Sequence, residues 1–141
     1  MVLEKVEESY KGQFCSSLEN LFCQEGYCSE CAISKKMIIY ISGPYSLGDV
    51  AENVRNACLA GNQILAKGHI PFVPHLTHLW HLITPKAQQE WLDIDLALIP
   101  RMDALLRLQG ESKGADDEVA LAKSLGIRVY YSLQEIRESV G

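Results

Sequence analysis

Glu118 is the residue whose surroundings most strongly suggest chemistry. On a helix over the Ala-rich segment 115–125, its neighbours three and four positions away are small or apolar: Gly114, Ala115, Leu121 and Ala122. The spacing therefore predicts that this carboxylate lies on the stripe facing the core. We expect the positive end of the helix dipole to lower its pKa and keep it ionised, as suits a nucleophile.

A plainer explanation is that acidic residues favour the first turn of a helix. Asp116 and Asp117 fit that explanation well. Glu118 fits it less well, because its neighbours form an apolar stripe.

Asp95 is placed in a similar way. Trp91 lies four residues before it and Leu98 three residues after it, so this carboxyl also follows an apolar stripe. Two carboxyls directed at one crevice allow divided roles, in which one attacks carbon and the other holds or donates a proton. Alone, Asp95 is a weak signal, because a buried Asp often only caps a neighbouring loop.

The loop GESKG at 110–114 offers polar groups just before this helix. Its backbone N–H groups and the Ser112 hydroxyl are suited to an anion or a sugar hydroxyl. It lacks the Gly-Lys-Ser/Thr ending of a P-loop. An ordinary helix cap by Ser112 accounts for the same residues.

The elements that must position these residues follow from hydrophobic patterning. The patterns predict strands at 37–42, 70–74, 104–108 and 127–131, and helices at 54–65, from Pro85 to 98, 115–125 and 133–139. Strands that alternate with helices predict an α/β fold of Rossmann or flavodoxin-like type, with a parallel sheet of four to five strands flanked by helices. Ligands bind such sheets at the carboxyl ends of the strands, where we expect residues 40–45 and 109–114.

Taken together, these segments resemble the nucleoside 2-deoxyribosyltransferase-like superfamily, including the deoxynucleoside 5′-monophosphate N-glycosidase-like proteins and small phage and bacterial relatives. Three segments carry the resemblance: IYISGPYS (39–46), the run of Trp91, Asp95 and Asp103, and SKGADDEVALAKSLGIRVY (112–130). The match extends from about Met37 to Tyr131, so we expect a domain of this type over residues 37–141.

The resemblance implies cleavage or transfer at the N-glycosidic bond of 2′-deoxynucleosides or deoxynucleotides. Glu118 would attack the anomeric carbon and form a covalent deoxyribosyl intermediate, Asp95 would act on the departing base, and Tyr40 would position Glu118. The chemistry agrees, since an oxocarbenium-like transition state is stabilised by a nearby anion. No cofactor is needed for it, and a homodimer or larger assembly is implied.

The same resemblance places the substrate beside Gly43, Pro44, Ser112 and Gly114. Ser112 matches a position that touches the sugar or its 5′ substituent, and Gly43 lets the backbone approach the ligand. Phosphate-preferring relatives carry arginine in the loop after the first strand. Here that loop is PYSLGDV, without Arg or Lys, so a preference for 5′-monophosphates is not expected.

Four histidines lie close together at positions 69, 75, 78 and 81. His75 and His78 share a helical face in one reading and would then bind a metal. No acidic or cysteine ligand lies among them, so we favour a substrate-pocket wall that includes His75, with Trp80 or Trp91 stacking on the base.

Residues 1–36 form a Cys-rich N-terminal extension of different character. Their cysteines are spaced C-x7-C-x4-C-x2-C, at Cys15, Cys23, Cys28 and Cys31. An iron–sulfur cluster and zinc are both compatible with four thiolates at such spacing. Free thiols remain an equal alternative, and any metal here would be structural or redox-sensing. Cys58 lies apart, on the stripe of the 54–65 helix, where we expect a core residue.

Composition narrows the partners. The chain has 141 residues, 48% of them hydrophobic, and a net charge of −5 with its Lys and Arg scattered. Without a basic stripe or a long apolar run, we expect neither a nucleic-acid nor a membrane partner. The acidic first residues predict a cytoplasmic protein with a small-molecule substrate. Two other classes stay open: a non-catalytic sensor of nucleotide-derived ligands and a redox-regulated protein built on the N-terminal cysteines.

Overall fold

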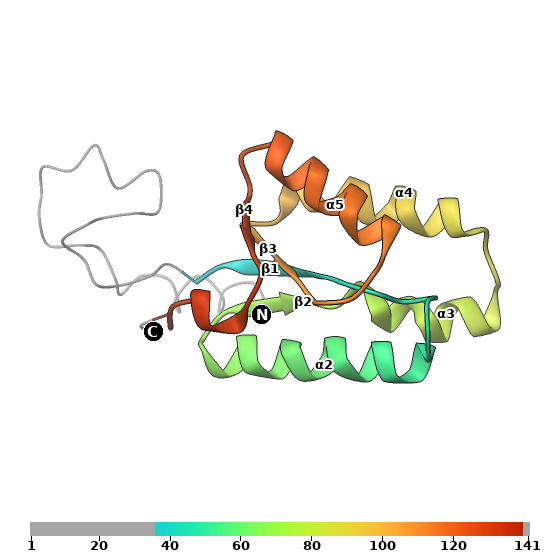
Figure 1. Cartoon of the computed structure of the whole chain (residues 1–141), viewed down its shortest axis with the longest axis horizontal. Coiled ribbons are helices and arrows are strands. Elements are labelled where there is room, and N and C mark those ends of the chain that lie inside the picture. Colours follow the sequence, from blue (N-terminus) through green and yellow to red (C-terminus); the bar gives the residue numbers. More distant parts are fainter. Residues whose placement is uncertain (1–35, 140–141) are drawn as a thin grey trace, which may run out of the picture. The chain divides into compact units, whose positions relative to one another are not determined.

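The computed structural model describes residues 36–139 (Figure 1). The extension with Cys15, Cys23, Cys28 and Cys31, and hence its predicted metal or cluster, lies outside the described residues. The described elements follow in chain order: β1 (Ile38–Ser42), α2 (Val50–Ala66), β2 (Ile70–Phe72), the 3-10 turn η2 (Pro74–Thr77), α3 (His78–Ile83), α4 (Gln88–Leu98), η3 (Ile99–Arg101), β3 (Ala104–Arg107), α5 (Lys113–Ser124), β4 (Arg128–Tyr130) and η4 (Leu133–Glu135).

The four described strands form a parallel sheet in the order β2-β1-β3-β4. Tyr40 is paired with Phe72 on one side and with Leu105 on the other. The last residue of β1, Ser42, is paired with Arg107 at the end of β3. The predicted α/β class and parallel sheet are confirmed, with strands whose carboxyl ends all meet at one edge.

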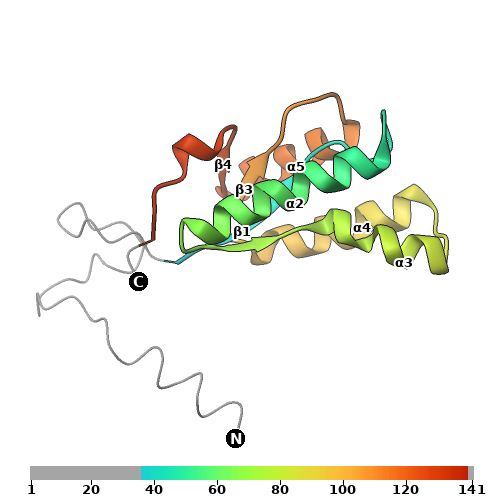
Figure 2. The ribbon, with the colours of Figure 1, turned by 90° about the horizontal axis from the view of Figure 1, so that it is seen from below.

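Helices cover both faces of this sheet. Helix α2 lies on one face, and α4 and α5 lie on the other (Figures 1 and 2). Because β1 is buried between the two layers, its side chains alternate between two apolar clusters. Ile39 and Ile41 join Ala57 and Ile64 beneath α2, whereas Tyr40 packs on the other face. That alternation makes Tyr40 and Ser42 neighbours on the face that carries α4 and α5.

Side-chain caps fix where the two central helices begin. The Asp49 carboxylate accepts hydrogen bonds from the backbone of Ala51 and Glu52 at the start of α2. The Ser112 hydroxyl accepts one from Ala115 N at the start of α5, over 3.2 Å. These bonds satisfy N–H groups that have no partner within the helix. The α5 cap places Glu118 one and a half turns along a helix of fixed origin.

Several predicted boundaries differ from the structure. The helix expected from Pro85 begins at Gln88, because Ala87 is its N-cap and the Ala87 N–H donates to the Glu90 side chain. The second strand ends at Phe72, since Pro74 opens the η2 turn. The helix expected at 133–139 is only the short η4 turn.

Two further differences concern single features. Helix α3, within the His- and Trp-rich segment, was not anticipated as a separate element. Cys58, expected in the core, is half-buried and lies at the margin of a groove beside β2. In the part of the chain that the structure describes, every helix is too short or too polar to cross a bilayer.

The strand order reverses between β1 and β3. After β2 is added on one side of β1, the chain crosses over and adds β3 and β4 on the other side. The connections leaving β1 and β3 therefore diverge at the carboxyl edge, and such a switch point opens a crevice in parallel α/β sheets. Ser42 and Arg107 lie at this switch point.

Candidate active site

A buried carboxylate lies directly over the switch point. Glu118 is 7% exposed, on the face of α5 that also buries Ala115 and Ala122. The Tyr40 hydroxyl donates to Glu118 Oε1 over 2.9 Å, and the Ser42 hydroxyl donates to Oε2 over 2.5 Å. Each carboxylate oxygen therefore has its own hydroxyl donor from β1. Two donors fix the plane of the carboxylate as well as its position.

The environment of Glu118 differs in one respect from the sequence-based expectation. Glu118 is the sixth residue of α5 and not part of its first turn. Burial raises the pKa of this carboxyl, and the hydrogen bonds from Ser42 and Tyr40 and the charge of Arg107 lower it only in part. The expected lowering of its pKa by the helix dipole is therefore wrong, because desolvation outweighs the stabilising contacts.

Asp95 faces the same residues from α4. Its side chain is half-buried, and burial together with the charge of Glu118 raises its pKa to about 7. Tyr40 and Asp95 also influence each other's pKa, so Asp95 lies close to the hydroxyl that donates to Glu118. The pKa of Tyr40 is raised by burial and by both carboxylates, which keeps this hydroxyl protonated. The three side chains form a single chain of polar groups.

This arrangement allows a defined distribution of protons. Tyr40 has one proton, which it donates to Glu118. With that proton engaged on Glu118, Asp95 has less support for its ionised form, and burial and the charge of Glu118 favour its protonated form. Such a chain holds one carboxylate as an anion and the other carboxyl as an acid near neutral pH. Two carboxyls with separated protonation states suit nucleophilic attack and proton donation, respectively.

The other predicted site residues surround this centre to differing degrees. Ser112 caps α5, and Gly114, in the first turn of that helix, lies near Leu92 of α4. Gly43 packs so closely on Leu108 that an added Cβ would be 3.0 Å from the Leu108 side chain. The packing on Leu108 therefore explains a glycine at position 43 without any ligand.

His75 and Pro44 form a contact of their own. His75 is buried, and its Nε2 donates to the Pro44 carbonyl over 3.0 Å. Burial lowers the pKa of His75, which favours the neutral imidazole. Its Nδ1 is then an acceptor, and it is buried without a hydrogen-bond partner. The contact ties η2 to the loop after β1.

The aromatic residues gather beside α4. Trp91, one turn before Asp95, donates from Nε1 to His81 over 2.9 Å, and its ring meets that of Trp80 edge to face at 5.1 Å. His78 hydrogen-bonds with the Tyr45 hydroxyl over 2.6 Å. Among the residues that the structure describes, no three His, Cys, Asp or Glu side chains are grouped to hold a metal ion. The histidines are thus engaged by aromatic and backbone partners.

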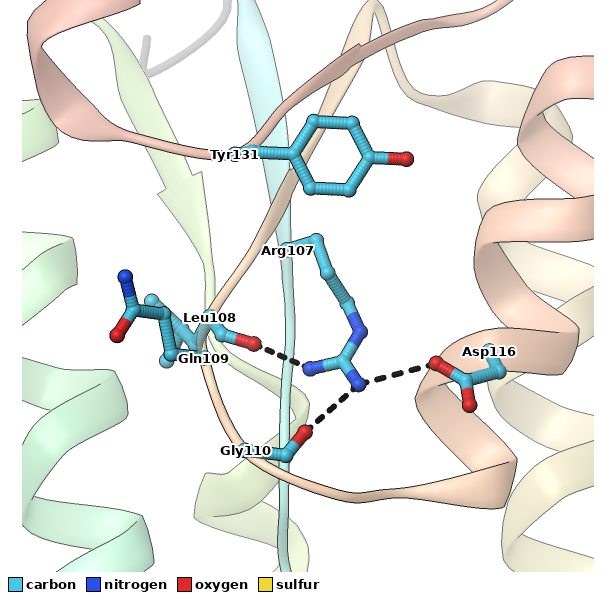
Figure 3. Close-up of a pocket in the computed structure, with 6 residues that line it drawn as sticks. All are labelled: Arg107, Leu108, Gln109, Gly110, Asp116 and Tyr131. Carbon is cyan, nitrogen blue, oxygen red and sulfur yellow. Dashed lines mark hydrogen bonds and ion pairs between the residues drawn. The ribbon is translucent and has the colours of Figure 1, made fainter.

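Two residues of this site were not anticipated. Ser42 ends an apolar strand, two residues beyond Tyr40, and that spacing places both on one face of the sheet. Arg107 ends β3 and pairs in register with Ser42. A cavity of about 450 Å³ opens beside it, lined by Arg107, Leu108, Gln109, Gly110, Asp116 and Tyr131 (Figure 3). The sequence did contain a signal for both residues, because each is a polar residue at the end of an apolar strand.

Comparison with known proteins adds a family. A model described as a domain of unknown function, DUF7768, matches residues 37–132. The chain belongs to the DUF7768 family. The matched residues include Tyr40, Ser42, Asp95, Arg107 and Glu118. Glu118 and Asp95, which we call the carboxyl pair, therefore lie within the DUF7768 domain together with the hydroxyl donors of Glu118. No curated protein matches the sequence.

The fold of this DUF7768 domain is nucleoside 2-deoxyribosyltransferase-like. A solved structure of a 2-deoxyribosyltransferase from the psychrotolerant bacterium Bacillus psychrosaccharolyticus is similar to it, with a TM-score of 0.50 and 22% sequence identity. The similarity covers 65% of this chain and 69% of that chain. At this level of identity the comparison establishes the arrangement of strands and helices.

Proposed function

We propose that this protein cleaves the N-glycosidic bond of 2′-deoxynucleosides, with Glu118 as nucleophile and Asp95 as proton donor. The observation that carries the proposal is the buried Glu118 carboxylate, with a hydroxyl on each oxygen, facing a second carboxyl whose pKa is about 7. A residue with only a structural role gains nothing from burying two carboxyls together, because each raises the energy of the other's ionised form.

The first step is a displacement at the sugar. A Glu118 oxygen forms a bond to C1′ while the bond from C1′ to the base nitrogen breaks, and the electron pair of that bond leaves with the base. The departing base takes a proton from Asp95. The products are a deoxyribosyl ester of Glu118, a neutral base and an ionised Asp95. Tyr40 and Ser42 keep the attacking carboxylate in line throughout.

The second step reverses the first with a new acceptor. Water or a second base attacks C1′, the ester bond to Glu118 breaks, and Asp95 takes up the proton that the acceptor releases. Two displacements at one carbon retain the configuration at C1′. A 2′-hydroxyl destabilises the cationic sugar, so ribonucleosides should react more slowly than deoxynucleosides.

The test is release of free base from each deoxynucleoside and deoxynucleotide, followed by chromatography, with and without a second base. Glu118→Gln should lower the rate at least about a thousandfold, because the amide cannot form the ester. Glu111→Gln is the matched control, since Glu111 is exposed on the neighbouring loop. Intact mass should show a deoxyribosyl adduct on the wild type and none on Glu118→Gln. An adduct on another residue, or ligand binding without base release, would refute the proposal.

A further inference from the structure

Arg107 makes an unusual set of contacts at the end of β3. Its guanidinium donates to the carbonyls of Leu108 and Gly110 and to Asp116 Oδ1, the last two over 2.9 and 3.0 Å. Figure 3 shows the side chain directed along the cavity toward Gly110 and Asp116. Only 11% of the Arg107 side chain is exposed, whereas 70% of the Asp116 side chain is exposed. The buried partner of this ion pair is therefore the cation.

These contacts join both ends of the loop between β3 and α5. Leu108 and Gly110 lie at the start of the loop, and Asp116 lies in the first turn of α5. Within the loop, Gly110 has a φ of +113° and an added Cβ would be 2.7 Å from the Pro44 side chain. The planar guanidinium donates to several acceptors at fixed angles, which a lysine ammonium cannot do. Arg107 thus holds an otherwise irregular loop in one conformation.

The same guanidinium also acts on Glu118, whereas no such effect reaches Asp95. In the parallel register Arg107 is paired with Ser42, and the Ser42 hydroxyl donates to Glu118. The groups that act on the Glu118 carboxyl are Tyr40 and Ser42 from β1, Arg107 from β3 and Asp117 from α5, and Asp95 faces it from α4. Arg107 is the one cation among them. Its charge lowers the pKa of Glu118, whereas burial raises the pKa of both carboxyls.

We propose that Arg107 is a positioning residue that assigns the two roles within the carboxyl pair. By clamping the loop, it fixes α5 over Ser42, and its charge adds to the hydrogen bonds from Ser42 and Tyr40 in keeping Glu118 the anionic member, so that the proton stays on Asp95. Without this cation the two buried carboxyls compete for one proton, and part of the population carries it on the nucleophile. The proposal rests on the proposed function for its catalytic meaning, but the ionisation of Glu118 is measurable without any substrate.

The direct experiment is a carbon-13 NMR titration of the full chain with labelled glutamate carboxyls, with Glu118→Gln assigning the Glu118 signal. In Arg107→Met the midpoint of Glu118 should move to higher pH, because the cation is lost. In Arg107→Lys it should move less. Lys113→Met is the matched control. Lys113 is a nearby cation in the first turn of α5, but 92% of its side chain is exposed, and it pairs with Asp117. That variant should leave the midpoint unchanged.

The kinetic experiment separates charge from clamping. In Arg107→Met the ratio of base-release rates at pH 5 and pH 8 should fall by roughly tenfold, as expected when a nearby opposite charge is removed. Arg107→Lys should largely restore that ratio but keep a lower kcat, since lysine supplies the charge and not the fork of donors. Circular dichroism confirms that each variant is folded, and Arg107→Gln, which removes the charge but keeps an amide donor for the loop, carries the test if Arg107→Met does not fold.

The outcomes are distinguishable. An unchanged Glu118 midpoint in folded Arg107→Met, or an equal shift in Lys113→Met, would overturn the role of Arg107 whatever the enzyme does. A shifted midpoint in a protein that releases no base from any deoxynucleoside would leave Arg107 as the residue that sets the charge of Glu118. In that case the proposed function is what fails.

Discussion

Replacing Asp95 with asparagine should change how the stability of the protein depends on pH. Asp95 has a pKa of about 7 in the folded chain against an ordinary value of 3.8. Because the pKa is higher in the folded state, Asp95 contributes fully to the free energy of unfolding below pH 3.8. This contribution is lost as the pH rises through 7. The asparagine side chain does not ionise, so the variant lacks this loss entirely.

The magnitude follows from the difference between the two pKa values. A difference of about 3 units corresponds to roughly 4 kcal/mol in the free energy of unfolding, of which roughly 2.5 kcal/mol falls between pH 5 and pH 8. These figures are upper values, because Asp95 is half-buried and partly hydrated. Relative to wild type, Asp95→Asn should therefore become progressively more stable as the pH rises over this range.

The assay is urea unfolding followed by circular dichroism at pH 5, 6, 7 and 8. The quantity of interest is the difference in unfolding free energy between Asp95→Asn and wild type, since contributions from other groups largely cancel in it. Asp93→Asn is the control, because Asp93 lies on the exposed side of the same helix. A difference for Asp95→Asn that stays within about 0.5 kcal/mol across the range would show that Asp95 ionises normally. It would then be no proton donor at neutral pH.

Further predictions concern Tyr40, the loop between β3 and α5, and the exposed apolar residues of α3. Tyr40→Phe should lower kcat for base release by roughly 100-fold with little change in KM, because the carboxylate loses its alignment; an unchanged kcat would remove Tyr40 from the mechanism. Gly110→Ala should destabilise the fold by about 1–3 kcal/mol through its φ of +113° and the contact with Pro44, measured against Gly48→Ala, which has a positive φ and open space. Light scattering should show a dimer, because Leu79 and Ile83 expose 68% and 80% of their surface; a monomer at micromolar concentration would contradict this.

Much of the fold was accessible from the sequence, because the apolar patterns are strong and local. The run from 37 to 42 is a buried strand, and the spacing around Glu118 correctly places its side chain against the sheet. The burial of Glu118 and its contact with Tyr40 agree with expectation, whereas their catalytic roles remain predictions. Element ends were less predictable, since they depend on caps such as the bond from Ala87 to Glu90.

What the sequence could not provide was the pairing of distant residues. Ser42 and Arg107 are 65 positions apart and meet only because β1 and β3 are adjacent and in a particular register. Similarly, the raised pKa of Glu118 reflects how many atoms surround it, which overrides the helix dipole. Local patterns show which residues face the interior, but tertiary packing decides which of them meet and how strongly each is desolvated.

The short edge strand β2 has a consequence for how this protein associates. Ile70 donates its N–H to Met37 on the β1 side, and successive N–H groups point to alternate sides of a strand. The outward position in β2 therefore belongs to Pro71, which has no N–H to offer. An incoming strand would find no donor at the centre of this edge, so the sheet resists extension and fibre-like stacking here. Association at this side of the molecule must then use side chains, and the apolar residues of the adjacent η2 and α3 are available for it.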